Sequence, residues 1–185
     1  MLVLASASPR RQELLRAANI VFEVLPAHIN EDPIPGEMPK ACVERLALEK
    51  AQAIALQRPY DSVLSADTIV VIGNQILNKP VDHSDAIRMI RLLSGHRHEV
   101  ITGVCLIHEG KCEVASETTA VTMSEISERE IAAYVATGEP MDKAGAYAIQ
   151  GIASRWIPRI EGDYNNVVGL PIARVYRMLQ QAKLI

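Results

Sequence analysis

Residues 2–15 contain the feature that most constrains the fold: a short apolar run is followed at once by a tight polar loop and a helix start. The run Leu-Val-Leu at 2–4 is typical of a buried strand. Ser8 is a favourable N-cap and Pro9 suits the first helical position, so a helix is expected to begin there. Its buried face is expected at Leu14, Leu15 and Ala18. The segment therefore predicts a strand that leads directly into a helix.

Two arginines, Arg10 and Arg11, stand in the first turn of this expected helix. A helix N-terminus already carries partial positive charge, so a cation there is unfavourable by about 0.3–1 kcal/mol. Free backbone N–H groups, the hydroxyls of Ser6 and Ser8 and two guanidinium groups would together form a receptor for phosphate. The alternative is that both arginines are solvated, or paired with Glu13 and a neighbour. The energy involved is too small to decide between the two interpretations.

The composition is that of one globular domain with a substantial core: 185 residues, of which 49% are hydrophobic and 22% charged. Aromatic residues make up only 4%, so the core is expected to be aliphatic. The chain has no apolar run approaching the roughly 18 residues of a membrane span and no secretory signal pattern. The three cysteines lack metal-site spacing, as expected of reduced cytosolic thiols. A cytoplasmic protein without a membrane partner is therefore expected.

Strand and helix patterns intermix along the chain. Apolar and β-branched runs predict strands at 2–4, 21–25, 62–72, 75–77, 98–108, 111–123 and 156–160. Helical spacing of apolar residues predicts helices at 9–18, 40–57, 84–94, 127–137 and 171–183. The Pro-rich acidic segment 27–39 is predicted to be a loop, long enough to have a function. We therefore expect one α/β domain, residues 1–185, with a mixed sheet flanked by helices.

Asp67 is the sharpest single position, because it interrupts the otherwise apolar and β-branched run of residues 62–72. A carboxylate inside a buried strand must be paired, hydrogen-bonded, protonated or bound to a metal ion, since an isolated buried charge is costly. The alternative is an exposed bulge in which Asp67 faces water. The cost of burial favours a functional role.

Four further residues have ordinary interpretations when they are taken alone. Glu31 lies in the acidic loop and is expected to be solvated. Lys50, in the middle of a helix, would be a surface lysine, and Lys79, in a turn, would face solvent. Gln150 follows the small-residue run 144–149, which permits either close approach of a ligand or a tight packing corner.

Several common chemistries are not indicated. The chain has neither a Walker A sequence nor a dinucleotide-binding glycine fingerprint. His96 and His98 are close in sequence, but no cysteine or acid cluster accompanies them to form a zinc site. A nucleophile elbow is missing as well. The net charge of −3 gives no basic field for a nucleic-acid backbone. An enzyme of this sequence would therefore work with carboxylates, basic residues and a divalent ion.

Several blocks, in this order, resemble the Maf family of nucleoside-triphosphate pyrophosphatases over nearly the whole chain. They are residues 6–11 (Ser-Ala-Ser-Pro-Arg-Arg), 48–51, 65–70 (Ser-Ala-Asp-Thr-Ile-Val), 78–80, 93–98, 102–104, 142–151 and 167–171. The form Ala-Gly-Ala-Tyr-Ala-Ile-Gln-Gly at 144–151 is similar to the subgroup that acts on dTTP and UTP, rather than the one that acts on 7-methyl-GTP.

The resemblance implies an α/β fold similar to that of the inosine-triphosphate pyrophosphatases, the Maf/Ham1 fold. It also implies hydrolysis of dTTP and UTP, and of modified uridine triphosphates, to the monophosphate and pyrophosphate, in a house-cleaning role. A divalent metal cation, Mg²⁺ or Mn²⁺, is implied as cofactor. The expected partner is a small-molecule nucleoside triphosphate and not a nucleic acid, and a homodimer is expected.

The resemblance also assigns roles by motif match. Asp67 takes the place of the family's proton acceptor, and Glu31 and Asp67 are the expected metal ligands. The expected substrate-binding residues are Ser6, Arg10, Arg11, Lys50, Thr68, Lys79 and Gln150, of which Arg10, Thr68 and Gln150 match the specificity positions. Two positions depart from the pattern. Asn30 stands where an acid commonly precedes Glu31, which could weaken metal binding, and Asn78 replaces a usual glycine, which would alter only a turn.

Two other functions stay open. One is a non-catalytic nucleotide-binding regulator of septum formation and cell division; the other is a pyrophosphatase that prefers purines or a damaged base. The full set of Asp67, Lys50, Lys79 and Gln150 favours catalysis. Asp67 could orient and deprotonate the attacking water, act as a metal ligand, or do both. Gln150 offers an amide that could accept from N3–H of uracil or thymine and donate to O4.

Overall fold

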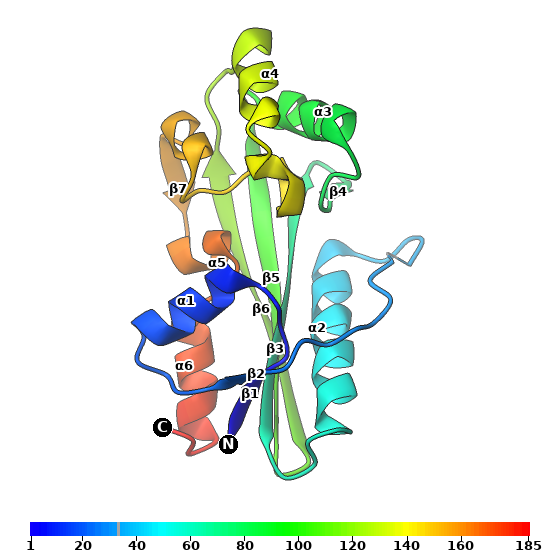
Figure 1. The fold of residues 1–185 in the computed structure, drawn as a ribbon, viewed down its shortest axis with the longest axis vertical. Helices are drawn as coiled ribbons and strands as arrows, with labels where there is room; N and C mark the ends of the chain where they lie inside the picture. The colour runs from blue at the N-terminus through cyan, green and yellow to red at the C-terminus, as the bar shows by residue number, and fades with distance from the viewer. Residues whose placement is uncertain (33) are drawn as a thin grey trace. The chain divides into compact units, whose positions relative to one another are not determined.

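Seven strands pair into one mixed sheet in this computed structural model, which describes residues 1–32 and 34–185 (Figure 1). They are β1 (Leu2–Leu4), β2 (Glu23–Val24), β3 (Ser62–Ile72), β4 (Gln75–Leu77), β5 (Arg97–His108), β6 (Lys111–Thr122) and β7 (Arg159–Glu161). The strand order is β2-β1-β3-β5-β6-β7, and β4 pairs with β3. β1 is parallel to β2 and β3, whereas β4 and β7 are antiparallel to their partners.

Six α-helices accompany the sheet within the described residues. They are α1 (Pro9–Ala17), α2 (Pro39–Ala55), α3 (His83–Leu93), α4 (Glu128–Ala136), α5 (Tyr164–Val168) and α6 (Ile172–Gln181). Short 3₁₀ turns occupy Glu139–Asp142, Ala144–Ala146 and Ile152–Trp156. None of the described helices is long and apolar enough to cross a membrane.

The chain divides into two compact units, which are described separately. Unit 1 comprises residues 1–68, 102–117 and 169–185, and unit 2 comprises residues 69–101 and 118–168. The strands β3, β5 and β6 each begin in one unit and end in the other.

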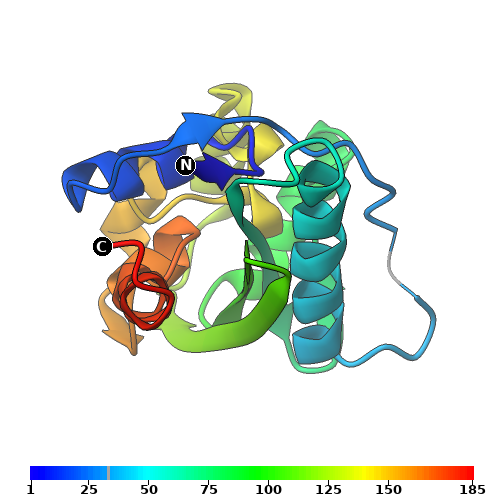
Figure 2. The ribbon, with the colours of Figure 1, turned by 90° about the horizontal axis from the view of Figure 1, so that it is seen from below.

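Unit 1 has helices on both faces of its strands (Figure 2). Because side chains alternate along a strand, Leu4 of β1 and its register partner Leu64 of β3 contribute to one apolar cluster, with α1 and α6. The intervening Val3 and Val63 contribute to the cluster on the other face, with α2. The unit is therefore a sheet with α1 and α6 on one face and α2 on the other.

Gly103 of β5 allows α2 to lie unusually close to the strands of unit 1. A Cβ atom at Gly103 would overlap the backbone carbonyl of Val43 on α2, and backbone cannot move aside as a side chain can. The short distance brings the buried face of α2 against β3. This contact places the candidate site residues of α2 described below.

The core of unit 2 forms around α3 and α4, which lie together in Figure 1. A capping box begins α4, because Ser127 and Glu130 each bond the backbone N–H of the other. Tyr134 of α4 packs edge-on against Trp156, with ring centroids 5.4 Å apart. His98 of β5 is buried and its Nε2 lies 2.7 Å from the hydroxyl of Tyr147.

Most predicted elements are confirmed, with four corrections. The strand predicted at 21–25 is only Glu23–Val24. The strand predicted at 156–160 is wrong at its start, because Trp156 closes a 3₁₀ turn and packs into the core of unit 2, and β7 begins at Arg159. The helix α5 was not predicted. Ser8 is the N-cap residue of α1, but its side chain makes no capping hydrogen bond.

We predict that His98 makes unit 2 sensitive to acid. Burial lowers the pKa of His98 to about 4, from an ordinary value of 6.5. The unfolded chain therefore binds this proton at a higher pH than the folded chain does. The stability that depends on neutral His98 is complete above pH 6.5 and is lost as the pH falls towards 4, by about 3 kcal/mol in total. Urea unfolding at pH 7.5, 5.5 and 4.5 measures this loss.

The variant His98→Gln is the control, because its amide can still bond Tyr147 but does not titrate. We expect its stability to fall less steeply than that of the wild type over this pH range. The carboxylates that also titrate there are common to both proteins and cancel in the difference. Parallel pH profiles for the two proteins would contradict the prediction.

Candidate active site

Asp67 lies in the continuous strand β3 and is buried, with an exposed fraction of 7%. The bulge considered as the alternative is therefore absent at this position of β3. Its Oδ1 lies 2.6 Å from Nζ of Lys50 on α2, which is equally buried. An ammonium group at this distance compensates the charge of a carboxylate that the strand removes from water. The sequence interpretation of Asp67 as a buried, paired acid is confirmed.

The interpretation of Lys50 as a surface lysine is wrong. Lys50 lies on the buried stripe of α2, one helical turn after Leu46 and Ala47 and one turn before Ile54. Its aliphatic stem can pack along this stripe while the ammonium group reaches Asp67. The helical spacing already contained this signal, because residue 50 continues the apolar positions 43, 46 and 47.

Glu31 shares the same ammonium group. Its Oε1 lies 3.1 Å from Nζ of Lys50, and its side chain is half-exposed, at 52%. The long loop before α2 thus brings a second carboxylate to the cation that Asp67 binds. The expectation that Glu31 is solvated is confirmed by its exposed side chain, but its carboxylate also pairs with Lys50. Lys50 therefore lies between one buried and one accessible carboxylate.

Arg11 organises a second network in unit 1. Its guanidinium group donates from Nε to the carbonyl oxygen of Gly169, at 2.9 Å. It also donates to the hydroxyls of Ser6, at 3.1 Å, and Thr68, at 3.0 Å. Burial lowers the pKa of Arg11, while the charge of Asp67 opposes this shift. An arginine nevertheless stays protonated, so the network carries a fixed positive charge.

The sequence left two interpretations of Arg10 and Arg11: a receptor for phosphate, or side chains that are solvated or paired with Glu13. The network of Arg11 differs from the second interpretation. Arg11 is neither solvated nor paired with Glu13, since its donors bind the neutral acceptors Gly169, Ser6 and Thr68. Arg10 lies half-buried in the first turn of α1. The hydroxyl of Ser6 accepts from the backbone N–H of Ser8 as well. The first turn of α1 therefore presents backbone N–H groups beside a fixed cation, the arrangement that favours an anion.

The two networks meet at the adjacent residues Asp67 and Thr68. Because successive side chains of a strand point to opposite faces, Asp67 belongs to the face of α2 and Thr68 to the face of α1. The hydroxyl of Thr68 also lies 2.9 Å from that of Thr102 on β5. A single dipeptide of β3 thus joins a carboxylate–ammonium centre to a guanidinium–hydroxyl centre.

Thr102 and Gly169 contact this site, although sequence reasoning assigned no role to either residue. Thr102 fixes the hydroxyl of Thr68, and Gly169 supplies the carbonyl that orients Arg11. Both fall inside blocks that carried the family resemblance, but a hydroxyl or a carbonyl in such a block has no distinctive charge. Only the fold reveals that they contact the arginine network.

Lys79 and Gln150 lie in unit 2, and both side chains are exposed. The turn that contains Lys79 is joined to the segment that precedes Gln150, because the carbonyl oxygen of Asn78 accepts from the backbone N–H of Gly145, at 3.1 Å. Gly145 has a φ of 67°, and a Cβ atom there would overlap Val70 of β3. Unit 2 therefore holds these two residues on neighbouring segments that pack on one strand.

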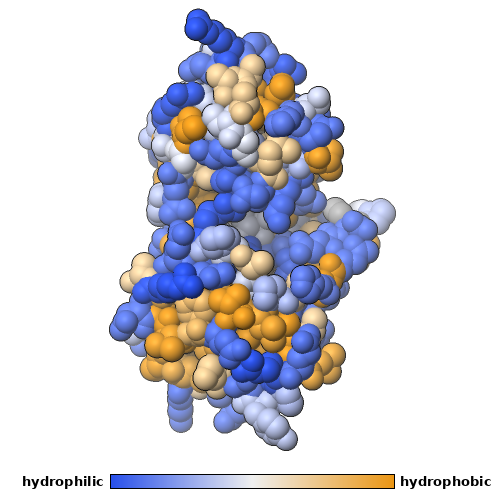
Figure 3. Space-filling view, in the orientation of Figure 1, coloured by the Kyte–Doolittle hydropathy of each residue, from blue (hydrophilic) through white to orange (hydrophobic). Residues whose placement is uncertain are grey.

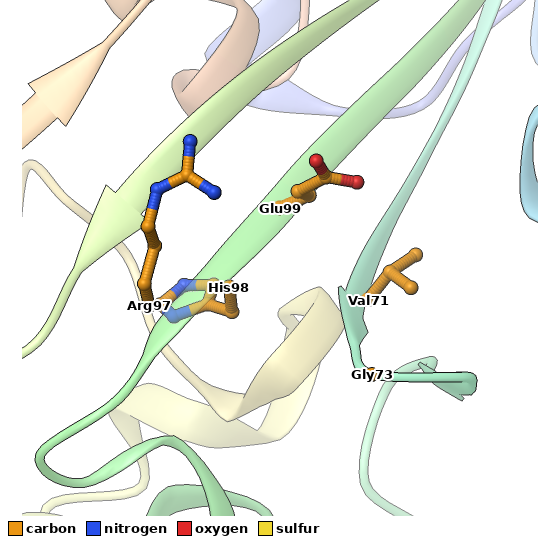
Figure 4. A pocket seen from close by; sticks show the side chains of 5 residues that line it. All are labelled: Val71, Gly73, Arg97, His98 and Glu99. Carbon is orange, nitrogen blue, oxygen red and sulfur yellow. The ribbon is translucent and has the colours of Figure 1, made fainter.

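Unit 2 also has a hollow of about 250 Å³ in its surface (Figure 4). Arg97, His98 and Glu99 of β5 line it, together with Val71 and Gly73 at the end of β3. This hollow contains none of the residues that the sequence assigned to the site. Arg97 lies 3.8 Å from Glu161, so its charge is partly compensated within unit 2.

The chemistry of the donors in unit 1 fits a hard divalent cation. Glu31 and Asp67 supply carboxylate oxygens, which Mg²⁺ prefers, and both already approach one positive charge on Lys50. Within residues 1–32 and 34–185 no group of three His, Cys, Asp or Glu side chains could hold a metal ion. Two carboxylates match sites in which substrate phosphates and water complete the coordination.

We predict that Lys50→Met destabilises the protein by about 3–5 kcal/mol, because the carboxylate of Asp67 is left buried without its ammonium partner. Urea unfolding at pH 7 measures the change. Lys40→Met is the matched control, since Lys40 begins the same helix with a side chain that is 69% exposed. A surface substitution of this kind changes stability by less than about 0.5 kcal/mol.

Adding Asp67→Asn to Lys50→Met should recover part of the loss, since the buried charge is then removed. If Lys50→Met proved no more destabilising than Lys40→Met, the ion pair would not stabilise the fold.

Comparison with known proteins agrees with the sequence blocks. The sequence model of the family described as Maf-like protein matches residues 1–182. A protein of Koribacter versatilis named dTTP/UTP pyrophosphatase is 61% identical over 184 residues, covering 100% of this chain and 95% of the relative. A protein of the same name from Syntrophomonas wolfei is 51% identical, and the match covers 95% of this chain and 94% of the relative. Another from Geobacter sulfurreducens is 50% identical, and the match covers 97% of this chain and 95% of the relative. The chain therefore belongs to the Maf family.

Proposed function

We propose that this chain is a nucleoside-triphosphate pyrophosphatase that hydrolyses dTTP and UTP to the monophosphate and pyrophosphate. The observation that carries the proposal is the buried Asp67, held by Lys50 beside the accessible Glu31. Relatives that are 50–61% identical over 94–95% of their own length bear the name of this activity. The proposal includes a cytoplasmic location and a house-cleaning role, with modified uridine triphosphates as further substrates.

The reaction is an attack of water on the α-phosphorus. The water oxygen forms a bond to phosphorus, and the bond from phosphorus to the bridging oxygen of pyrophosphate breaks. Asp67 accepts the water proton at Oδ2, since Lys50 occupies its Oδ1. Arg10, Arg11 and Lys79 bind the phosphates, and Ser6 holds Arg11 in position. The cations neutralise the charge that accumulates on the departing pyrophosphate.

Glu31 and Asp67 are the residues that would hold a divalent cation. When bound, Mg²⁺ or Mn²⁺ supplies charge neutralisation at the phosphates and lowers the pKa of a bound water. Lys50 keeps both carboxylates directed to the same place before the ion arrives. Asn30, which replaces a common acid beside Glu31, removes one negative charge from this site.

Gln150 is proposed to read the pyrimidine base. Its amide oxygen can accept from N3–H, and its NH₂ group can donate to O4, which are features shared by uracil and thymine. Its exposed side chain is free of the core packing that fixes Ala146 and Tyr147 in the same segment. Thr68, fixed by Arg11 and Thr102, is the proposed specificity residue of unit 1.

We infer that the chain forms a homodimer. Unit 1 exposes hydrophobic side chains at Met1, Val21, Tyr176 and Ile185. Figure 3 shows hydrophobic residues gathered over α6 and β2 on the face that is drawn. An apolar surface of this kind is typical of an interface between copies of a chain. Light scattering of the purified protein measures the oligomeric state directly.

We predict that Asp67→Asn lowers kcat by about 10²–10⁴-fold, because the amide cannot accept the water proton. The measurement is pyrophosphate release from UTP, with nucleotide binding measured separately to show that the site is intact. Asp32→Asn is the matched control, since this acid neighbours Glu31 in the same loop and has no proposed role. Near-normal turnover by Asp67→Asn would overturn the catalytic assignment.

Substrate class and metal dependence are tested together with the wild-type protein. A panel of standard and modified triphosphates is incubated with and without Mg²⁺ or Mn²⁺, and the products are identified. We expect metal-dependent cleavage of dTTP and UTP in preference to purine nucleotides, and its loss when a chelator removes the metal. Bound nucleotide recovered unchanged would favour a non-catalytic regulator, and preferred cleavage of purines would overturn the pyrimidine assignment.

We predict that Gln150→Ala lowers kcat/KM for UTP and dTTP by about 10–100-fold, the effect of losing one or two hydrogen bonds to the base. Initial rates with UTP and with a poorly cleaved purine triphosphate give the selectivity ratio. Gln75→Ala, an exposed glutamine of β4, is the control. An unchanged ratio in Gln150→Ala would show that the base is read elsewhere.

A further inference from the structure

We propose that Cys105 and Cys112 form an oxidisable thiol pair, which a hydroperoxide converts into an intrachain disulfide. Their sulphur atoms lie 3.4 Å apart. The two residues belong to β5 and β6, which are neighbours in the sheet. Neither cysteine belongs to the candidate active site, so this proposal does not depend on the proposed function.

The hairpin geometry holds the two sulphurs together. β5 ends at His108 and β6 begins at Lys111, so only Glu109 and Gly110 connect the strands. Both have positive φ, 48° and 75°, as in the tight turns that join antiparallel strands. A disulfide joins sulphurs about 2.05 Å apart, so the two sulphurs have to move closer by about 1.4 Å when the bond forms.

The two thiols differ in a way that assigns them different roles. Cys112 is exposed, so a peroxide can reach its sulphur. Cys105 is fully buried, in the apolar cluster that contains Ala47 and Ala51 of α2. This burial keeps peroxide away from the Cys105 sulphur, whereas the sulphur of Cys112 is already in contact with it at 3.4 Å. Cys112 is therefore the residue that reacts first, and Cys105 is the residue that resolves the product.

The reaction balances with hydrogen peroxide as the oxidant. The sulphur of Cys112 attacks the peroxide, forming an S–O bond as the O–O bond breaks, and one water leaves. The sulphur of Cys105 then attacks the sulphur of Cys112; the S–S bond forms as the S–O bond breaks, and the thiol proton of Cys105 passes to the departing hydroxyl group, which leaves as a second water. Two thiols lose two electrons and two protons, and one peroxide becomes two waters. A dithiol reductant reverses the reaction by thiol–disulfide exchange.

The third cysteine provides an internal reference. Cys42 is buried on α2, and burial raises its pKa to about 11. The charge of Glu37 and a hydrogen bond to its carboxylate raise the pKa of Cys42 further, which disfavours a thiolate. Cys42 is therefore expected to keep its thiol while the other two residues react.

The experiment treats the reduced full-length protein with hydrogen peroxide, then unfolds it and labels the free thiols with N-ethylmaleimide. Intact mass should show three labels before oxidation and one label afterwards, on Cys42. The oxidised chain should be lighter by about 2 Da before labelling, because two hydrogens are lost. Peptide mapping should find residues 105 and 112 cross-linked, and dithiothreitol should restore three labels.

Cys112→Ser is the decisive variant, because it changes an exposed side chain and leaves the core intact. Under the same peroxide treatment it should keep labels on both Cys42 and Cys105. Cys105→Ala should instead carry a sulfenic acid on Cys112 that a dimedone probe captures. Three labels on oxidised wild type, a sulfinic acid on Cys112 beside free Cys105, or a disulfide between two chains would each overturn the proposal.

Discussion

The buried ion pair between Asp67 and Lys50 is the interaction on which the arrangement of unit 1 depends. Its two charges come from β3 and α2, so the pair forms only where these elements are in close contact. Gly103 permits that contact, because any side chain there would overlap the backbone of α2. Once the ammonium group is fixed on Asp67, the loop before α2 can deliver Glu31 to it. The ion pair, the close packing of α2 on β3 and the position of the loop before α2 therefore depend on one another.

The alternation of side chains along β3 links this ion pair to the hydrogen-bond network of Arg11. Residue 67 must face α2 to be paired, so residue 68 must face α1, where its hydroxyl accepts from Arg11. A one-residue slip of the strand would exchange the two faces and break both networks. The apolar residues around them, Leu64 and Val63, oppose such a slip, because each belongs to the cluster on its own side. Packing therefore fixes the register that the polar groups require.

The sequence predicts most of the elements, apart from α5 and the bounds of β2 and β7, but it does not predict which side chains pair. Residues 62–72 were predicted as a strand because β-branched residues dominate them, and Asp67 was recognised because it violates that pattern. Lys50, taken alone, is predicted to be a surface lysine, because a lysine within a helix is usually solvated. Its partner Asp67 lies 17 positions away in the chain, so the pattern of the helix does not reveal the ion pair. Gly169 could not be found, because its contribution is a backbone carbonyl, and every residue has one. Trp156 was misassigned since an aromatic residue suits a strand and a core-packed turn equally.

Burying two charges is difficult to justify by stability alone. An apolar pair of similar volume often stabilises a fold as well as a buried ion pair does, because the cost of desolvating the charges offsets their attraction. Stability alone would therefore allow aliphatic residues at positions 50 and 67. The presence of the pair is therefore weak evidence for a role in stability, and it is consistent with the role proposed for Asp67 above. The proton transfer proposed at the α-phosphorus would use a carboxylate that is held out of bulk water, paired with one cation and next to an accessible acid. The energetic cost of burying the pair is therefore an argument in favour of the catalytic role proposed for Asp67.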